Sequence, residues 1–147
     1  MKTTYPPIIV TQTFPVSAET VWKAITSIDE MKQWYFEVLS SFKPKVGFET
    51  RFTVSVEDRV YPHIWKVTEV IPKQKISYQW TFDGYKGKSV THWELSEENN
   101  KTTLKLTSEV LEPYPENIPE FERESGVEGW NYFIKKTLDI LFTDREI

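Results

Sequence analysis

Hydrophobic and polar residues alternate with a period of two over three stretches in the middle of the chain, at 48–56, 76–82 and 102–110. The alternation is strictest in the second stretch, where single polar residues separate four hydrophobic ones, Ile76, Tyr78, Trp80 and Phe82. A period of two places hydrophobic side chains on one face of an extended segment and polar side chains on the other. The pattern therefore predicts half-buried β-strands, each with one face toward a core.

Further segments have the composition of strands, at 8–14, 60–71 and 88–96, although the alternation is less regular in the last two. The connections between the middle strands are short and contain turn-forming residues: 57–59, 72–75, 83–87 and 97–100. Short connections of this kind favour hairpins, and consecutive hairpins form an antiparallel sheet. We thus predict an antiparallel sheet of about six strands.

Two short helices are predicted after the first strand. Pro15 ends that strand, and Ser17 follows as a candidate N-cap for a helix that extends to about Thr26. Residues 27–30 then read Ser-Ile-Asp-Glu, which is a capping box. This box predicts a second short helix that carries three large hydrophobic residues, Met31, Trp34 and Tyr35.

The C-terminal part of the chain changes to a helical period. A capping box at 125–128 predicts the start of a long helix. The hydrophobic residues of this helix recur at intervals of three and four positions and form one stripe: Trp130, Phe133, Ile134, Leu138, Leu141 and Phe142. Gly129 lies in the first full turn, where we expect it to permit a close approach of the helix to the sheet.

These elements predict an α+β protein in which a curved antiparallel sheet wraps around the long C-terminal helix. Several strands leave one hydrophobic face of the sheet uncovered, and the final helix is the one predicted element long enough to cover it. The sequence contains no internal repeat, low-complexity tract or linker. We therefore expect residues 1–147 to form a single domain.

Several short motifs accompany this order of elements: FPVSAE at 14–19, VWKAIT at 21–26, Trp34, GF at 47–48, VTEVIP at 67–72 and GW at 129–130. With these motifs the chain resembles the helix-grip superfamily of START-like (SRPBCC) and Bet v 1-like domains. Within that superfamily it most resembles the activator of Hsp90 ATPase homologue-like family, the type represented by the C-terminal domain of the activator. The likeness extends over nearly the whole chain.

The resemblance implies the helix-grip fold and, often, a hydrophobic pocket between the C-terminal helix and the sheet. The chain departs from the family pattern at two places where many relatives carry a glycine, since Val46 stands beside Gly47 and residues 63–66 read HIWK. The chaperone activator also has a separate N-terminal domain, for which these 147 residues leave no room. Hsp90 activation and a chaperone partner are therefore not carried over to this chain.

Aromatic residues are unusually frequent, at 15% of the chain. Those predicted to face the space between helix and sheet are Trp65, Tyr78, Trp80, Trp93, Trp130 and Phe133, to which Trp34 of the second helix is added. One interpretation is that these rings are simply core residues. The other is that they line a pocket for a hydrophobic or aromatic ligand, and so many bulky rings would leave only a modest cavity.

Two polar residues interrupt the predicted hydrophobic faces. His63 lies in register with Tyr61 and Trp65, and Ser108 interrupts the hydrophobic row of the strand at 102–110. In a pocket, such groups would fix the orientation of a ligand. The alternative is that they form hydrogen bonds inside the core or to buried water.

The proline-rich segment 112–124 is the one long irregular connection, and we predict that it forms a lid over the pocket. Phe121 would close the mouth of the pocket, while Glu120, Glu122 and Glu124 would remain in water. The alternative interpretation is a plain surface connector.

Charge and composition argue against several other classes of protein. The net charge is −4, and there is no stripe of Lys and Arg, so nucleic acids and anionic membranes are not expected as partners. The chain has no cysteine, and His63 and His92 lack the spacing of metal ligands, so no metal, other cofactor or catalytic residue is predicted. No apolar run exceeds three residues, and we expect a cytoplasmic location.

The sequence thus favours a non-enzymatic, intracellular domain that binds a small hydrophobic or aromatic molecule between helix and sheet. A protein-interaction or co-chaperone-like module without a functional pocket is the first alternative. A helix-grip enzyme such as a cyclase or hydrolase is the second, and it would need a buried acid or base near the rings.

Overall fold

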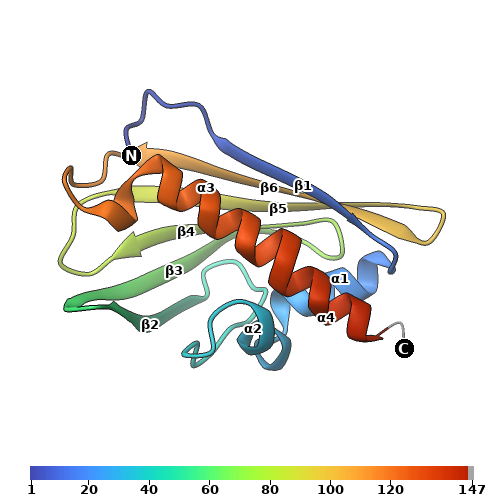
Figure 1. Cartoon of the computed structure of the whole chain (residues 1–147). Helices are drawn as coiled ribbons and strands as arrows, with labels where there is room; N and C mark the ends of the chain where they lie inside the picture. The colour runs from blue at the N-terminus through green and yellow to red at the C-terminus, as the bar shows by residue number, and fades with distance from the viewer. Residues whose placement is uncertain (146–147) are drawn as a thin grey trace.

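Six antiparallel strands form one sheet in the order β1-β6-β5-β4-β3-β2. The computed structural model describes residues 1–145 (Figure 1). The strands are β1 (Ile8–Phe14), β2 (Glu49–Val56), β3 (Arg59–Ile71), β4 (Lys75–Phe82), β5 (Lys88–Glu98) and β6 (Lys101–Glu112). Strands β2 to β6 pair with their neighbours in the sequence, and β1 pairs with β6 at the edge. The predicted antiparallel sheet is therefore confirmed.

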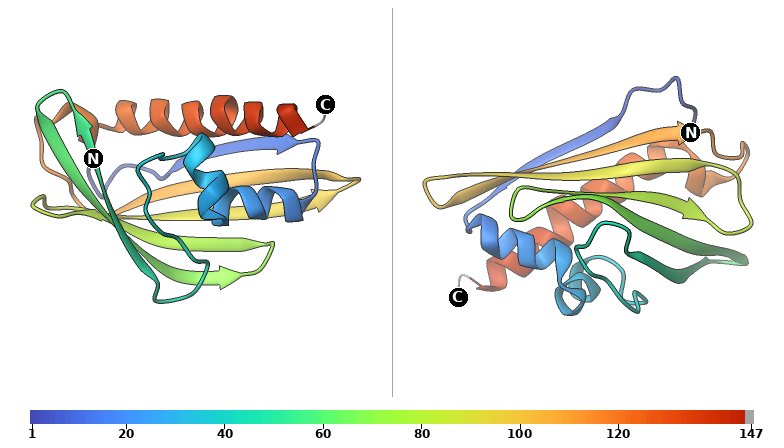
Figure 2. Two further views of the ribbon diagram at one scale, coloured as in Figure 1. Left: turned by 90° about the horizontal axis from the view of Figure 1, so that it is seen from below. Right: turned by 180° about the vertical axis from the view of Figure 1, so that it is seen from behind.

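A long C-terminal helix lies across the concave side of this sheet (Figures 1 and 2). It consists of three consecutive parts, α3 (Arg123–Asn131), the π-helical segment η2 (Tyr132–Thr137) and α4 (Leu138–Arg145). Two short helices follow β1, namely α1 (Ala18–Thr26), which contacts β5 and β6, and α2 (Ile28–Trp34), which contacts α4. The arrangement is the helix-grip α+β fold that the sequence predicts.

The helix starts agree with the predicted caps in part. Ser17 caps α1, since its hydroxyl accepts a hydrogen bond of 3.2 Å from the backbone N–H of Thr20. Ser27 occupies the N-cap position of α2, but its side chain forms no capping hydrogen bond. The long helix begins at Arg123 with Glu122 as its N-cap, so the predicted start at 125–128 is wrong. The short 3₁₀ helix η1 (Pro119–Phe121) ends one residue before Arg123, and the N-cap lies three residues earlier than the predicted one, Ser125.

The π-helical segment keeps one stripe of the helix on the sheet. Four buried residues follow one another at intervals of four, Trp130, Ile134, Leu138 and Phe142. In a regular α-helix each step of four residues rotates about 40° beyond a full turn, so the stripe would drift off the sheet. A π-helical turn contains more residues, which reduces this rotation. The segment η2 therefore lets all four side chains pack into the core.

The inward face of the sheet is aromatic, as the alternation predicts. In β3, Tyr61, His63, Trp65 and Val67 are all buried, and the residues between them are more exposed. One side of each strand thus contributes to the core and the other faces solvent. The alternation breaks between Val67 and Glu69, where the pairing of β3 with β4 shifts register.

The prediction that Gly129 permits a close approach of the long helix to the sheet is wrong. Gly126 has this role instead. A Cβ atom built on Gly129 would meet nothing within 4 Å. A Cβ atom on Gly126 would lie 3.1 Å from a methyl group of Ile8, so it is here that the helix approaches β1 closely. The space beside Gly129 belongs to a cavity that is described below.

A second, smaller hydrophobic cluster lies at the end of the sheet, built on Tyr61, Tyr114 and Phe121. The ring of Tyr114 packs directly on the backbone of Gly87, where a Cβ atom would overlap with the ring. Gly87 also has a φ of +115°, which side chains other than glycine rarely adopt. Glycine is therefore required at this position for two independent reasons.

We expect Gly87→Ala to lower the free energy of unfolding by about 1–3 kcal/mol more than Gly84→Ala, because it adds a steric clash to the backbone strain. Gly84 is a matched control, since its φ is +85° but a methyl group at this position would have no atom within 4 Å. Urea denaturation of both variants measures the difference. Equal losses of stability would show that Tyr114 does not pack on Gly87 as described.

Candidate functional site

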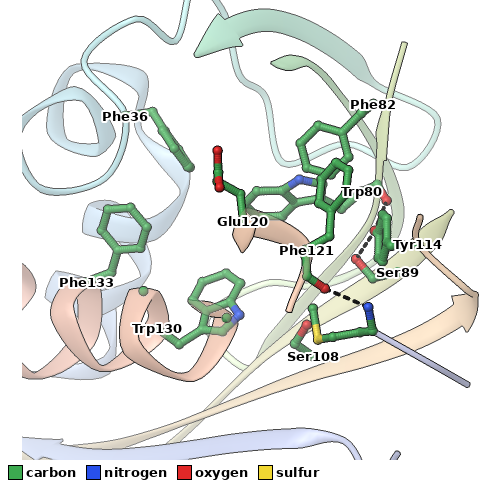
Figure 3. A pocket seen from close by; sticks show the side chains of 13 residues that line it. Phe36, Trp80, Phe82, Ser89, Ser108, Tyr114, Glu120, Phe121, Trp130 and Phe133 are labelled. Carbon is green, nitrogen blue, oxygen red and sulfur yellow. Dashed lines mark hydrogen bonds between the residues drawn. The ribbon is translucent and has the colours of Figure 1, made fainter. Parts of the chain in front are cut away.

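A cavity of about 160 Å³ lies between the start of the long helix and the inner face of the sheet (Figure 3). Its wall is mostly aromatic. The aromatic rings come mainly from β4, η1 and the long helix, together with Phe36, which lies two residues after the end of α2. The lining residues are Met1, Phe36, Trp80, Phe82, Ser89, Ser108, Tyr114, Glu120, Phe121, Gly126, Gly129, Trp130 and Phe133. The cavity is partly open to solvent.

Three hydroxyl groups give one part of the cavity a polar character. Ser89 of β5, Ser108 of β6 and Tyr114 line it. The Tyr114 hydroxyl lies 3.0 Å from the Ser89 hydroxyl and donates to the carbonyl of Trp80 at 3.1 Å (Figure 3). Burial raises the pKa of Tyr114 to about 12, so the phenol stays protonated at neutral pH. These hydroxyls offer hydrogen bonds to a ligand without adding charge.

Glu120 is the one carboxylate among the residues that line this cavity. The prediction that it stays in water holds only in part, because its side chain keeps 21% of its exposure and its carboxylate is bound by two other side chains. Its Oε1 atom accepts hydrogen bonds from the Arg59 guanidinium and, at 2.9 Å, from the Tyr61 hydroxyl. The hydrogen bond from Arg59 holds the pKa of the Glu120 carboxyl below its ordinary value. Glu122 and Glu124 are exposed, as predicted.

Five of the ten predicted site residues line the cavity: Trp80, Ser108, Phe121, Trp130 and Phe133. Phe121 closes one end of it from the proline-rich connection, where it is only 4% exposed and packs against the rings of Tyr114 and Phe82. The backbone carbonyl of Phe121 accepts a hydrogen bond of 2.6 Å from the amino group of Met1 (Figure 3).

The other five do not line the cavity. One of them, His63, lines a separate pocket between β2 and β3. Four of them lie in the solid part of the core, Trp34, Trp65, Tyr78 and Trp93. The ring of Tyr35 fills the space between several of them, with its centroid 4.6 Å from Trp34 and 5.3 Å from Trp65. The hydroxyls of Tyr35 and Tyr78 lie 3.0 Å apart, and Trp93 Nε1 donates to Tyr78 at 3.0 Å. Desolvation raises the pKa of both phenols, so this buried network is uncharged.

His63 is buried among aromatic rings and does not line the aromatic cavity between helix and sheet. Its ring centroid lies 4.7 Å from that of Phe52 and 4.6 Å from that of Phe82, and its Nδ1 atom lies 2.9 Å from the carbonyl oxygen of Tyr61. Desolvation lowers the pKa of His63 to about 4, which outweighs the opposing effect of this hydrogen bond. The imidazole is therefore neutral at pH 7.

Sequence reasoning missed several lining residues. Phe82 continues the alternating row of β4 beyond Trp80, so the alternation predicts that its side chain faces inward. Phe36 follows α2, and nothing in its local sequence indicates that its ring reaches the cavity. Ser89 lies on the inward side of β5, but a register shift between Lys88 and Ser89 hides this in the sequence.

Two structural features bear on other kinds of site. Within residues 1–145, no group of three or more His, Asp or Glu side chains is arranged to hold a metal ion. The helices that the structure describes are all too short or too polar to cross a membrane.

The buried His63 makes a specific pH dependence expected. Because its pKa is about 6.5 in the unfolded chain and about 4 in the folded protein, only the unfolded chain takes up this proton between these values. The contribution of the neutral His63 to the free energy of unfolding is therefore fully present above pH 6.5. It decreases by about 2–3 kcal/mol as the pH falls toward 4. Chemical denaturation at a series of pH values measures the loss.

The variant His63→Phe keeps a flat ring at this position but cannot titrate. Between pH 7 and pH 4 its free energy of unfolding should decrease less than that of the wild type. The difference between the two decreases should be about 2–3 kcal/mol. Parallel curves for the two proteins would show that His63 is protonated in the folded state and is not desolvated.

Solved structures with the same fold confirm the architecture. Protein CV1439 from Chromobacterium violaceum superimposes with a TM-score of 0.76 at 19% sequence identity, over 92% of this chain and 96% of that one. Protein MLL2253 from Mesorhizobium loti gives a TM-score of 0.70 at 25% identity, over 95% of this chain and 97% of that one. The Aha1 dimer from Colwellia psychrerythraea, solved in solution, gives 0.70 at 19% identity, over 94% of this chain and 97% of that one.

The sequence itself matches one family profile over most of its length. The profile is that of activator of Hsp90 ATPase homolog 1-like proteins, and it matches residues 15–143. Among proteins with curated descriptions, none matches the chain. The matched region includes both short helices, strands β2 to β6 and most of the long helix. The chain therefore belongs to the family of activator of Hsp90 ATPase homolog 1-like proteins.

Proposed function

We propose that this protein binds a small, largely hydrophobic molecule with a single aromatic ring in the cavity between the long helix and the sheet. The observation that carries the proposal is the cavity itself, about 160 Å³ of space with an aromatic wall in an otherwise tightly packed core. Pockets that combine an apolar wall with a few polar groups are typical of small-molecule sites.

The size of the cavity limits the ligand. A cavity of about 150 Å³ in another protein core is large enough for benzene, so one six-membered ring with a short substituent fits here. An empty, dry cavity of this size would cost about 4 kcal/mol, at about 24 cal/mol per Å³. A bound ring would recover much of this energy through contact with the wall, whereas water contacts the aromatic surface poorly.

The wall supplies both ring contacts and hydrogen bonds. Trp80 and Trp130 lie with their ring centroids 5.8 Å apart and nearly perpendicular, so that a third ring can pack against both. Ser108 and the pair of Ser89 and Tyr114 can orient a hydroxyl or carbonyl substituent. For a ligand of about eight heavy atoms we expect a dissociation constant of about 0.1–1 mM, equivalent to about −5.5 to −4 kcal/mol.

Titration with benzyl alcohol, followed by amide chemical shifts, tests the proposal. Shifts are expected in the wild type for residues around the cavity, including Trp80 and Trp130. The variant Gly129→Leu should bind at least tenfold more weakly, because its side chain would occupy open space at the cavity wall. Gly129→Ala is the matched control, which adds one methyl group, should be as stable as the wild type or more so, and should still bind.

Absence of shifts in the wild type with benzyl alcohol and with other single-ring compounds would contradict ligand binding. Equal binding by Gly129→Leu would place the ligand elsewhere. A stoichiometric protein partner that binds the wild type and Gly129→Leu equally well would favour the interaction-module alternative over the cavity.

A further inference from the structure

The rim of the cavity carries an excess of negative charge. Arg59 pairs with Glu120, and its Nη1 atom also lies 3.6 Å from a carboxylate oxygen of Glu57 and 3.8 Å from one of Asp58. One guanidinium is thus shared by three carboxylates, and the cluster has a formal charge of −2 (one positive charge and three negative). Glu57 and Asp58 are exposed and screened by solvent, whereas Glu120 faces the cavity.

We propose that the ligand of this cavity carries a positively charged amine, which binds the Glu120 carboxylate while the ring lies among Trp80, Trp130 and Phe133. The inference rests on the proposed function and adds the chemical class of the ligand, a primary or substituted aromatic amine. The site would select against neutral and anionic molecules of the same shape.

The geometry of Glu120 leaves room for such a group. The hydrogen bonds from the Arg59 and Tyr61 side chains both end on Oε1. These contacts fix the carboxylate from one side and leave Oε2 without a side-chain donor in the part of the chain that the structure describes. Figure 3 shows the carboxylate between the ring of Phe36 and those of Trp80 and Phe82. An ammonium group there would have a carboxylate oxygen and aromatic faces as partners.

Among residues 1–145, the other cationic or basic groups near the cavity do not neutralise this carboxylate from within it. His63 faces the neighbouring rings of Phe36 and Trp80 but is uncharged at pH 7. The Met1 amino group donates a hydrogen bond to the carbonyl oxygen of Phe121, and the carboxylates that interact with its charge are those of Glu122 and Glu116.

Three probes of the same shape test the inference, namely benzylamine, benzyl alcohol and benzoate, each titrated at pH 7 and low ionic strength. We expect the wild type to bind benzylamine about tenfold more tightly than benzyl alcohol, a difference of about 1.4 kcal/mol. Benzoate should bind most weakly. The preference for the amine should decrease at high salt, since the rim is open to solvent.

The variant Glu120→Gln should lose the preference for benzylamine over benzyl alcohol, because the amide preserves the shape of the side chain but carries no charge. Glu124→Gln is the matched control, since it removes the same charge from an exposed position nearby and should keep the preference. The outcomes separate the two proposals. Equal binding of the amine and the alcohol by the wild type would overturn this inference alone, whereas no binding of any probe would overturn the proposed function as well.

Discussion

The packing of the long helix into the concave face of the sheet is the interaction on which the rest of the structure depends. It requires four side chains spaced by four residues, from Trp130 to Phe142, to stay on one side of the helix. The π-helical segment η2 makes this possible, and within it the Thr137 hydroxyl donates to the carbonyl of Trp34, at the end of α2, at 2.7 Å. The long helix is thus joined to α2 by a hydrogen bond and to the sheet by its buried side chains.

The cavity results from how two hydrophobic clusters meet. The larger cluster is filled by Tyr35 and its neighbours, and hydrogen bonds join the side chains of Tyr35, Tyr78 and Trp93. The buried Nε1 atom of Trp65 has no hydrogen-bond partner in the part of the chain that the structure describes. The smaller one is held by Tyr114 and Phe121, which come from the connection between β6 and the helix. Side chains of both clusters line the cavity, which lies where the two clusters meet. The connection therefore shapes the space that the sheet and helix leave open.

The fold was largely predictable because it follows from local periodicity. The strict alternation of β4 identifies its inward rings, and Ser17 identifies the start of α1 through a hydrogen bond within one turn. The limits of the cavity depend instead on contacts between distant segments. Glu120 pairs with Arg59, 61 residues away, and this pairing brings a carboxylate to the cavity. No pattern in the sequence around either residue predicts the pairing. The exchange of roles between Gly126 and Gly129 likewise depends on where Ile8 lies.

The tightly packed core and the side chains around the cavity differ in how freely their residues can be replaced during evolution. Substitutions of the buried Tyr35, Tyr78 or Trp93 would break a shared network, so these positions tolerate little change. Side chains at the rim contact empty space on one side, and single replacements there alter size or charge without disturbing the scaffold. Specificity can diverge in small steps while the backbone persists. This difference between core and rim is compatible with solved structures that share the fold at 19% sequence identity.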